Sequence, residues 1–161
     1  MSTTSTKQFM TTEQLLEHWQ GHRNLTRRTL EAFPEKELFD FSIAGMRSFS
    51  KMIVELISIA GPSLKSIVEN SIEKYDESSF NPTTKVEILK KWDEETLVIN
   101  DYFKQISEER FQETFNLFGE FEFPIYENIL YFIDNEIHHR AQGFIYLRAL
   151  GIQPPFFWER F

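Results

Sequence analysis

The segment TTKVEILKKWDEETLVINDYFKQI, residues 83–106, decides the fold class. Six of its residues, five of them apolar, follow one another at steps of 3, 4, 3, 4 and 3, which places them on one face of an α-helix. They are Leu89, Trp92, Thr96, Ile99, Phe103 and Ile106. Thr83 or Thr84, followed by Glu87, forms a capping-box signature for a helix start. The segment therefore predicts an amphipathic helix that buries one face against other elements.

Three further segments are also predicted to be helices. Residues 12–33 carry a helical stripe that begins after a capping threonine, Thr11 or Thr12, and stops at Pro34. Residues 46–74 predict another helix, with Ser48 as a possible cap. Gly61-Pro62 either ends or kinks this helix, or Pro62 opens its continuation. Residues 124–150 predict the last helix, with Gly151 placed as its C-terminal cap. Four such helices predict an all-α protein built as a four-helix bundle.

Turn residues, and the alternation of apolar and polar residues, predict the structure of the segments that connect the helices. EKELFDFSIAG, residues 35–45, is predicted to be a connection that ends at a glycine. FQETFNLFGEFEF, residues 111–123, alternates apolar and polar residues around its glycine, which predicts a short hairpin or extended excursion before the last helix. We expect one domain over residues 1–161, with a flexible start at 1–10.

Charge and composition narrow the class of protein. The net charge of −8 argues against nucleic-acid binding, because the one basic cluster, Arg23, Arg27 and Arg28, fits an ordinary helix surface. The absence of cysteine excludes disulfides, thiolate metal sites and thiol nucleophiles. The first ten residues have no apolar core, so they predict neither a signal peptide nor an anchor, and no apolar run is long enough to span a bilayer. We expect a soluble, cytoplasmic protein that contacts no membrane.

Glu55 is the only charged residue between Met52 and Gly61. Its helical neighbours Met52 and Ile59 are apolar, so the carboxylate lies on an apolar face. Burying a lone carboxylate costs several kcal/mol unless it is paired, coordinated or protonated. Either another group in the fold balances Glu55, or the position is a bundle edge from which the carboxylate reaches water.

The last helix offers a partner. Asn135 and His139 lie one turn apart on one stripe, a spacing at which two side chains of a helix can hold one ion. His138 points roughly 100° away, so the two adjacent histidines do not act as a pair. Gln142 and Tyr146 continue the His139 stripe. Glu136 and Arg140 are interpreted as surface charges.

On the first predicted helix, His22 falls on the inward stripe and His18 precedes it by one turn. We expect His22 either to line the cavity together with Gln142 and Tyr146 or to lie partly exposed at the edge of the core. The sequence has neither a glycine-rich phosphate loop nor a nucleophile elbow, so it does not predict phosphate binding or a serine triad.

Four stretches resemble the DinB/YfiT-like family. They are MRSF at 46–49, EIHHRAQGFIYLRALG at 136–151, PPFFWER at 154–160 and HRNLTRRTLEAFPEKEL at 22–38. The resemblance implies a four-helix bundle with up-down-down-up connectivity and frequent homodimers. It also implies a divalent metal, often nickel or zinc, bound by three histidines. Members of that family include thiol transferases, an isomerase and proteins without a known activity.

Position by position, the resemblance places the three family ligands at Glu55, Asn135 and His139. Only one of the three histidines is therefore retained. A carboxylate is a good ligand for Zn²⁺, whereas an asparagine amide offers only a weak carbonyl oxygen. The alternative to a metal site is a direct hydrogen-bonded pair of Glu55 and His139 across the bundle, which we favour.

Two functions follow from these alternatives. One is a metal-dependent hydrolase or thiol-dependent transferase, in which Zn²⁺ or Ni²⁺ on Glu55, Asn135 and His139 activates water or a low-molecular-weight thiol. Gln142 and Tyr146 would then be the polar groups nearest the reacting centre. The other is a catalytically inactive, stress-associated bundle that binds an apolar or acidic small molecule without metal. A purely structural dimer module is a third possibility.

Overall fold

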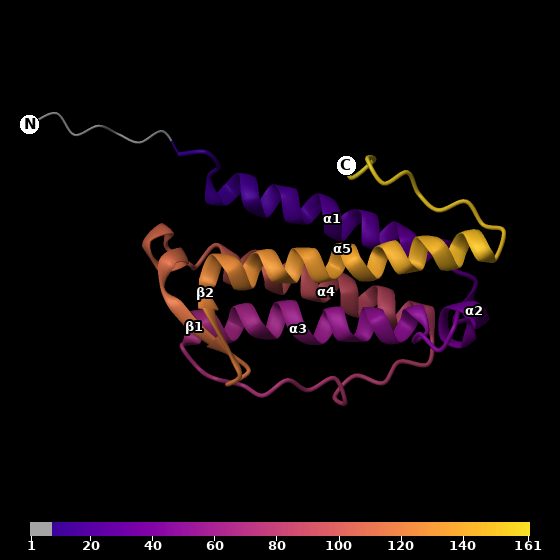
Figure 1. The fold of residues 1–161 in the computed structure, drawn as a ribbon, viewed down its shortest axis with the longest axis horizontal. Helices are drawn as coiled ribbons and strands as arrows, with labels where there is room; N and C mark the ends of the chain where they lie inside the picture. Colours follow the sequence, from indigo (N-terminus) through magenta and orange to yellow (C-terminus); the bar gives the residue numbers. More distant parts are fainter. Residues whose placement is uncertain (1–7) are drawn as a thin grey trace, which may run out of the picture.

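The computed structural model describes residues 8–161; most of the segment expected to be flexible, residues 1–7, lies outside them. Four long helices form the body of the molecule: α1 (Thr12–Ala32), α3 (Phe49–Glu69), α4 (Lys85–Phe103) and α5 (Ile125–Ala149) (Figure 1). The smaller elements are α2 (Glu35–Asp40), the 3₁₀-helix η1 (Glu108–Gln112) and the antiparallel strands β1 (Thr114–Leu117) and β2 (Phe121–Pro124). The predicted all-α bundle with an extended excursion before the last helix is confirmed.

The long helices have up-down-down-up connectivity. Figure 1 shows that α1 and α5 run in one direction, and that α3 and α4 run in the other. The segment 70–84 makes this possible by returning along the outside of the bundle from the end of α3 to the start of α4. Both α1 and α3 pack against both α4 and α5, so α1 and α3 occupy opposite corners.

The predicted helix starts are confirmed at two caps. Thr84 accepts a hydrogen bond from the backbone N–H of Glu87, and the Glu87 side chain accepts one from the backbone of Thr84. Thr11 and Gln14 form the equivalent capping box of α1. At the far end of the chain, Gly151 has a φ of +76°, which suits the glycine expected after α5.

The helix predicted for residues 46–74 is present with shorter bounds. It starts after Ser48, the possible cap, and of the alternatives for Gly61-Pro62 only an end of the helix there is wrong. The helix α3 begins at Phe49, passes through Pro62 and ends at Glu69, where Asn70 adopts the left-handed conformation with φ +51°. An internal proline costs about 3 kcal/mol. Apolar residues buried on both sides of it, including Ile59, Ala60 and Leu64, offset that cost by packing.

Residues 35–45 were predicted to be a plain connection, but their first half forms α2. Pro34 precedes its first turn, and Leu38 on its inner side is fully buried. A single buried leucine in six residues gives too little periodicity to be recognised as a helix. The hairpin prediction for 111–123 is confirmed: β1 pairs with β2, and Phe118 and Gly119 adopt positive φ in the turn.

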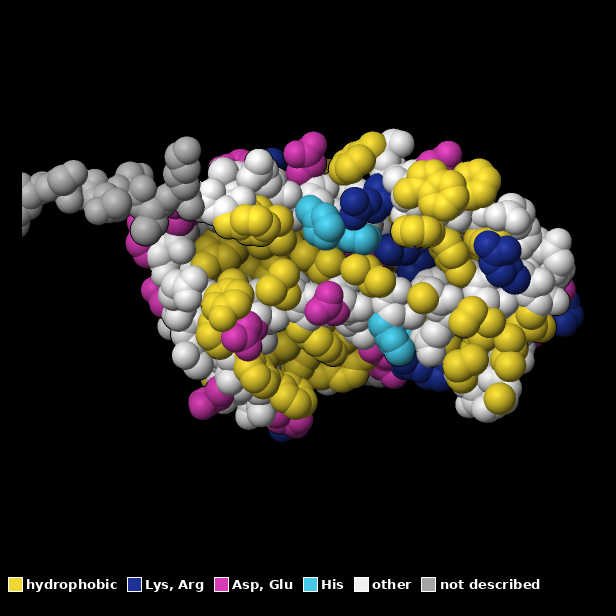
Figure 2. Space-filling model, turned by 45° about the horizontal axis from the view of Figure 1, so that its top comes forward, with side chains coloured by type: hydrophobic (Ala, Val, Ile, Leu, Met, Phe, Trp, Pro, Cys, Tyr) yellow, Lys and Arg dark blue, Asp and Glu magenta, His cyan; other side chains and the backbone are white. Residues whose placement is uncertain are grey.

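The core consists of two apolar clusters with polar side chains between them. On α1, Leu16 and Trp19 belong to one cluster and Leu30 to the other. On α5, Ile133 belongs to the first cluster and Tyr146 to the second. Figure 2 shows the same division on one face, where hydrophobic side chains gather at both ends and histidine and basic side chains lie between them. Within residues 8–161, no helix is both long and apolar enough to cross a bilayer.

Candidate functional site

The structure brings Glu55, Asn135 and His139 together. Glu55 lies in the middle of α3 and the other two in the middle of α5, and these helices are neighbours. His139 Nε2 is 3.1 Å from Glu55 Oε1, and Asn135 Nδ2 donates to the same oxygen at 3.3 Å. The direct carboxylate–imidazole pair considered from the sequence is therefore present.

The imidazole of His139 is held at both nitrogens. Its Nδ1 lies 2.7 Å from Gln142 Oε1, one turn further along α5, while Nε2 faces Glu55. Both ring nitrogens thus have an oxygen partner, which fixes the orientation of the imidazole. His138 is exposed and does not contact Glu55, in agreement with its predicted direction on the helix.

Arg47 completes the pairing of Glu55. Its guanidinium contacts Glu55 Oε2, and 42% of its side chain is exposed, compared with 17% for Glu55. Tyr146 supports this contact from below, because its hydroxyl donates to the Arg47 carbonyl at 2.8 Å. The hydrogen bond from His139, followed by those from Arg47 and Asn135, outweighs burial and lowers the pKa of Glu55 to about 2. Glu55 is accordingly ionised at neutral pH.

These residues do not fit a three-histidine metal centre. The set contains one imidazole, one carboxylate and one amide, and the amide nitrogen of Asn135 is the atom that faces Glu55. Both carboxylate oxygens already accept hydrogen bonds from protein donors, and one of these donors is a positively charged guanidinium. Across residues 8–161, no three histidine or acidic side chains are grouped closely enough to hold a metal ion.

A groove of about 580 Å³ lies over the ion pair of Arg47 and Glu55. Arg47 and Glu55 form its polar floor, and Tyr75, Phe118 and Tyr131 are among its aromatic walls. The walls come from three places: the returning segment 70–84, the hairpin and α5. A second, mostly apolar groove of about 370 Å³ runs beneath the hairpin and continues from the first.

The expectation that His22 lines this cavity needs correction. The helix α1 lies diagonally opposite α3, so its inward stripe reaches the other side of α5 and contacts Arg140 instead of Glu55. Of the other predicted lining residues, Gln142 positions His139, and Tyr146 is fully buried beneath Arg47.

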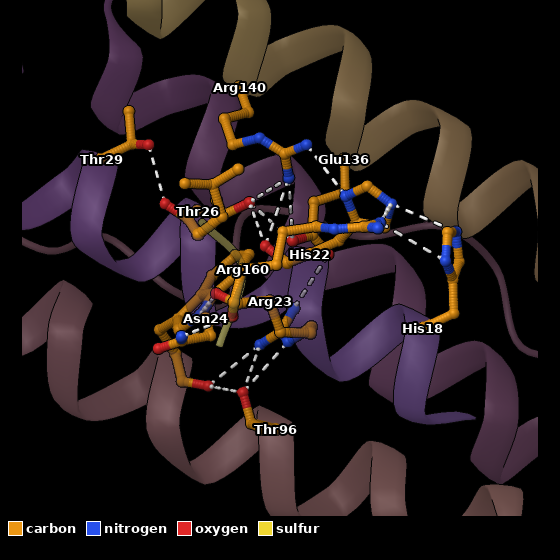
Figure 3. Close-up of polar contacts among 12 residues, drawn as sticks. His18, His22, Arg23, Asn24, Thr26, Thr29, Thr96, Glu136, Arg140 and Arg160 are labelled. Atoms are coloured by element: carbon orange, nitrogen blue, oxygen red, sulfur yellow. Dashed lines mark hydrogen bonds and ion pairs between the residues drawn. The ribbon is translucent and has the colours of Figure 1, made fainter. Parts of the chain in front are cut away.

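A buried charge cluster was missed by the sequence analysis. Arg23, Glu136 and Arg140, interpreted as surface residues, are 1%, 2% and 6% exposed. Figure 3 shows them between α1, α4 and α5. Glu136 accepts a 2.6 Å hydrogen bond from Thr26 and lies 3.8 Å and 4.0 Å from the two guanidinium groups.

The rest of the cluster satisfies the arginines. Arg23 donates to the carbonyl of Trp92 and to Thr96, and its guanidinium lies 3.5 Å from the centre of the Trp92 ring. The spacing could have shown this burial. Arg23 is four residues after Trp19 and three before Thr26, and Glu136 and Arg140 follow Ile133 at steps of three and four.

His22 connects the cluster to the C-terminal tail. Arg140 Nη2 lies 3.0 Å from His22 Nδ1, and because arginine only donates, this ring nitrogen is the acceptor. Arg160 of the tail lies 3.1 Å from His22 Nε2, and His18 Nε2 lies 3.2 Å from the same atom. Burial, followed by the positive charge of Arg140, lowers the pKa of His22 to about 3.

The pKa of His22 predicts early acid sensitivity. In the unfolded chain His22 takes up a proton near its ordinary pKa of 6.5, whereas in the folded chain it does so only near 3. The free energy of unfolding should therefore fall as pH decreases from 6.5 towards 3. Glu55 adds its own loss only later, as pH falls from 4.5 towards 2. Urea titrations at pH 7 and about pH 4.5 should show that His22→Gln removes roughly 1–3 kcal/mol of this loss. The control His138→Gln changes an exposed histidine and should leave this loss as it is in the wild type. An equal loss of unfolding free energy between the two pH values in both variants would contradict the role of His22.

Comparison with known proteins agrees with this architecture. The model of the DinB family matches residues 1–160. A DinB-like protein from Bacillus cereus superimposes with a TM-score of 0.75 at 16% identity, over 92% of this chain and 99% of that one. A DinB-like protein from Bacillus subtilis gives a TM-score of 0.71 at 18% identity, over 89% and 97%. No curated protein matches the sequence. The family match covers nearly the whole chain, and the chain therefore belongs to the DinB family.

Proposed function

We propose that this chain is a metal-independent member of its family that binds a small molecule in the groove over Arg47 and Glu55. One observation carries the proposal. Glu55, which lies where the family resemblance implies a metal ligand, has both oxygens engaged by His139, Asn135 and Arg47. A metal ion at this carboxylate would have to compete with the charge of a resident guanidinium and with two further donors, and it would gain only one imidazole in return.

The groove supports ligand binding by its size and lining. Volumes of about 580 Å³ and 370 Å³ for its two parts fall in the range of small-molecule sites. Phe121 and Tyr131 line both parts and are half exposed, at 50% and 45%. Exposed aromatic side chains that gather around a polar floor are typical of a binding groove.

A metal-dependent hydrolase or thiol-dependent transferase is the second candidate. It is favoured by the proximity of Glu55 and His139, two side chains able to coordinate Zn²⁺ or Ni²⁺. It requires Arg47 to leave Glu55 and Asn135 to turn its carbonyl oxygen inward. The partial exposure of Arg47 makes the first movement feasible.

A homodimer is part of the same proposal. The C-terminal tail carries Phe156, Phe157 and Trp158 with 47%, 67% and 62% exposure, and Phe156 stacks on Trp158. An exposed apolar patch of this kind is suited to self-association.

Binding should persist without metal. We expect the neutral probe N-phenyl-1-naphthylamine to bind saturably, with unchanged affinity in EDTA, and to lose affinity about tenfold in Tyr131→Ala. The control Leu97→Ala removes an apolar side chain of 65% exposure from α4, away from the groove, and should have no effect. Loss of probe binding on EDTA treatment, or equal weakening by both variants, would refute the proposal.

A further inference from the structure

We propose that the groove selects an organic cation, an amine or a heteroaromatic cation with an apolar body. The inference deepens the proposed function and depends on it. Arg47 and Lys74 are the positive residues of the polar part of the groove, and Glu55, Glu77 and Glu120 are the negative ones. Because Arg47 is already paired with Glu55, two carboxylates and a single lysine remain to meet a ligand.

The aromatic walls suit the same charge. Tyr75 and Phe118 approach with ring centroids 5.5 Å apart, and Phe121 and Tyr131 line the groove beside them. The face of an aromatic ring attracts a cation, and several rings around one space are the usual way in which proteins hold an ammonium group. An anion in this position would face the ring electrons and an excess of carboxylates.

Carboxylates of the groove contribute, after burial, to a raised pKa at two of its phenols. The pKa of Tyr75 is raised by burial and then by its hydrogen bond to Glu77, with a further contribution from Glu55. The pKa of Tyr131 is raised by burial and by Glu55. The carboxylates thus disfavour a second negative charge at either ring, even though Arg47 partly opposes them at Tyr75.

The neighbouring apolar groove provides room for the body of the ligand. It shares Phe118, Phe121 and Tyr131 with the polar part, and Leu117 and Phe123 extend it beneath the hairpin. Glu127 is the one charged residue that lines it, and this residue is negative. A ligand with its cationic group near Glu77 and its apolar body under the hairpin would therefore match both parts.

A cationic ligand differs from the apolar or acidic small molecule that we expected from the sequence. The residues responsible are remote from the helical motif. Glu77 and Tyr75 belong to the segment that returns outside the bundle, and Glu120 belongs to the hairpin turn. Their common position depends on how these connections fold over α3 and α5.

The test compares two aromatic dyes of opposite charge, thioflavin T (cationic) and 8-anilinonaphthalene-1-sulfonate (anionic). We expect thioflavin T to bind at least about tenfold more tightly and to be displaced by N-phenyl-1-naphthylamine. The double variant Glu77→Gln/Glu120→Gln should weaken thioflavin T about tenfold. Glu17→Gln/Glu94→Gln removes the same charge from exposed positions on α1 and α4 and should change its affinity less than about twofold.

The outcomes separate this inference from the proposed function. Equal or tighter binding of the anionic dye, or equal weakening by the two double variants, would overturn the choice of a cation while the neutral probe still binds. Failure of the neutral probe would instead overturn ligand binding by this groove as a whole.

Discussion

Replacing Glu136 by alanine is expected to lower the free energy of unfolding by about 3–5 kcal/mol. Glu136 is the carboxylate that lies between the buried guanidinium groups of Arg23 and Arg140. Burial raises its pKa and lowers the pKa of each arginine, while the opposite charges in the cluster counteract these shifts. Without Glu136, Arg140 would lose the carboxylate that counteracts its burial, Arg23 would keep only the charges of Glu95 and Asp93, and Thr26 would lose the acceptor of its hydrogen bond.

Equilibrium urea unfolding measures this effect. Asp134→Ala, an exposed change two residues earlier on α5, should stay within about 0.5 kcal/mol of the wild type. Glu136→Gln retains the volume and an acceptor oxygen for Thr26, so its loss should come mainly from the missing charge and should be smaller. A loss below about 1 kcal/mol for Glu136→Ala would show that water or another group compensates the arginines, contrary to the buried cluster described above.

The fold was predictable where local signals and packing agree. The stripe from Leu89 to Ile106, the capping threonines and Gly151 marked elements that the structure retains. The sequence left the path at Pro62 open, because proline ordinarily breaks a helix; buried neighbours on both sides keep α3 continuous there. Prediction failed at α2, whose six residues are too few for a periodic pattern.

Part of the site was predictable for a related reason. Glu55 on an apolar face demanded a partner, and the stripe of α5 supplied His139. Arg47 was not foreseen, because it precedes α3 and its approach to Glu55 depends on the chain path before the helix. Arg23, Glu136 and Arg140 were misassigned because charge was taken as a sign of exposure, although their spacing placed them on buried faces.

The central claim is that the family metal site has been replaced by an internally paired carboxylate. Glu55→His together with Asn135→His would remove the acceptor of Arg47 and place three imidazoles on α3 and α5. Imidazole is a far better ligand for Zn²⁺ and Ni²⁺ than an amide oxygen, and the neutral rings would no longer hold a guanidinium beside them. We therefore expect the double variant to bind Zn²⁺ more than about 100-fold more tightly than the wild type, a difference of about 2.7 kcal/mol.

Controls keep this comparison specific. His138→Gln in the double variant should leave its affinity unchanged, because His138 is exposed and does not contact Glu55. His18→Gln in the wild type tests whether the neighbouring His18 and His22, with ring nitrogens 3.2 Å apart, account for any residual binding. Circular dichroism of each variant should retain the helical spectrum of the wild type.

The decisive measurement is a calorimetric titration of the untagged wild type and the Glu55→His/Asn135→His variant with Zn²⁺. We expect weak or undetectable binding by the wild type and tight binding of one ion per chain by the variant. Wild-type binding as tight as that of the variant, abolished by His139→Ala, would show that Glu55 and Asn135 are competent ligands and would contradict the metal-independent site.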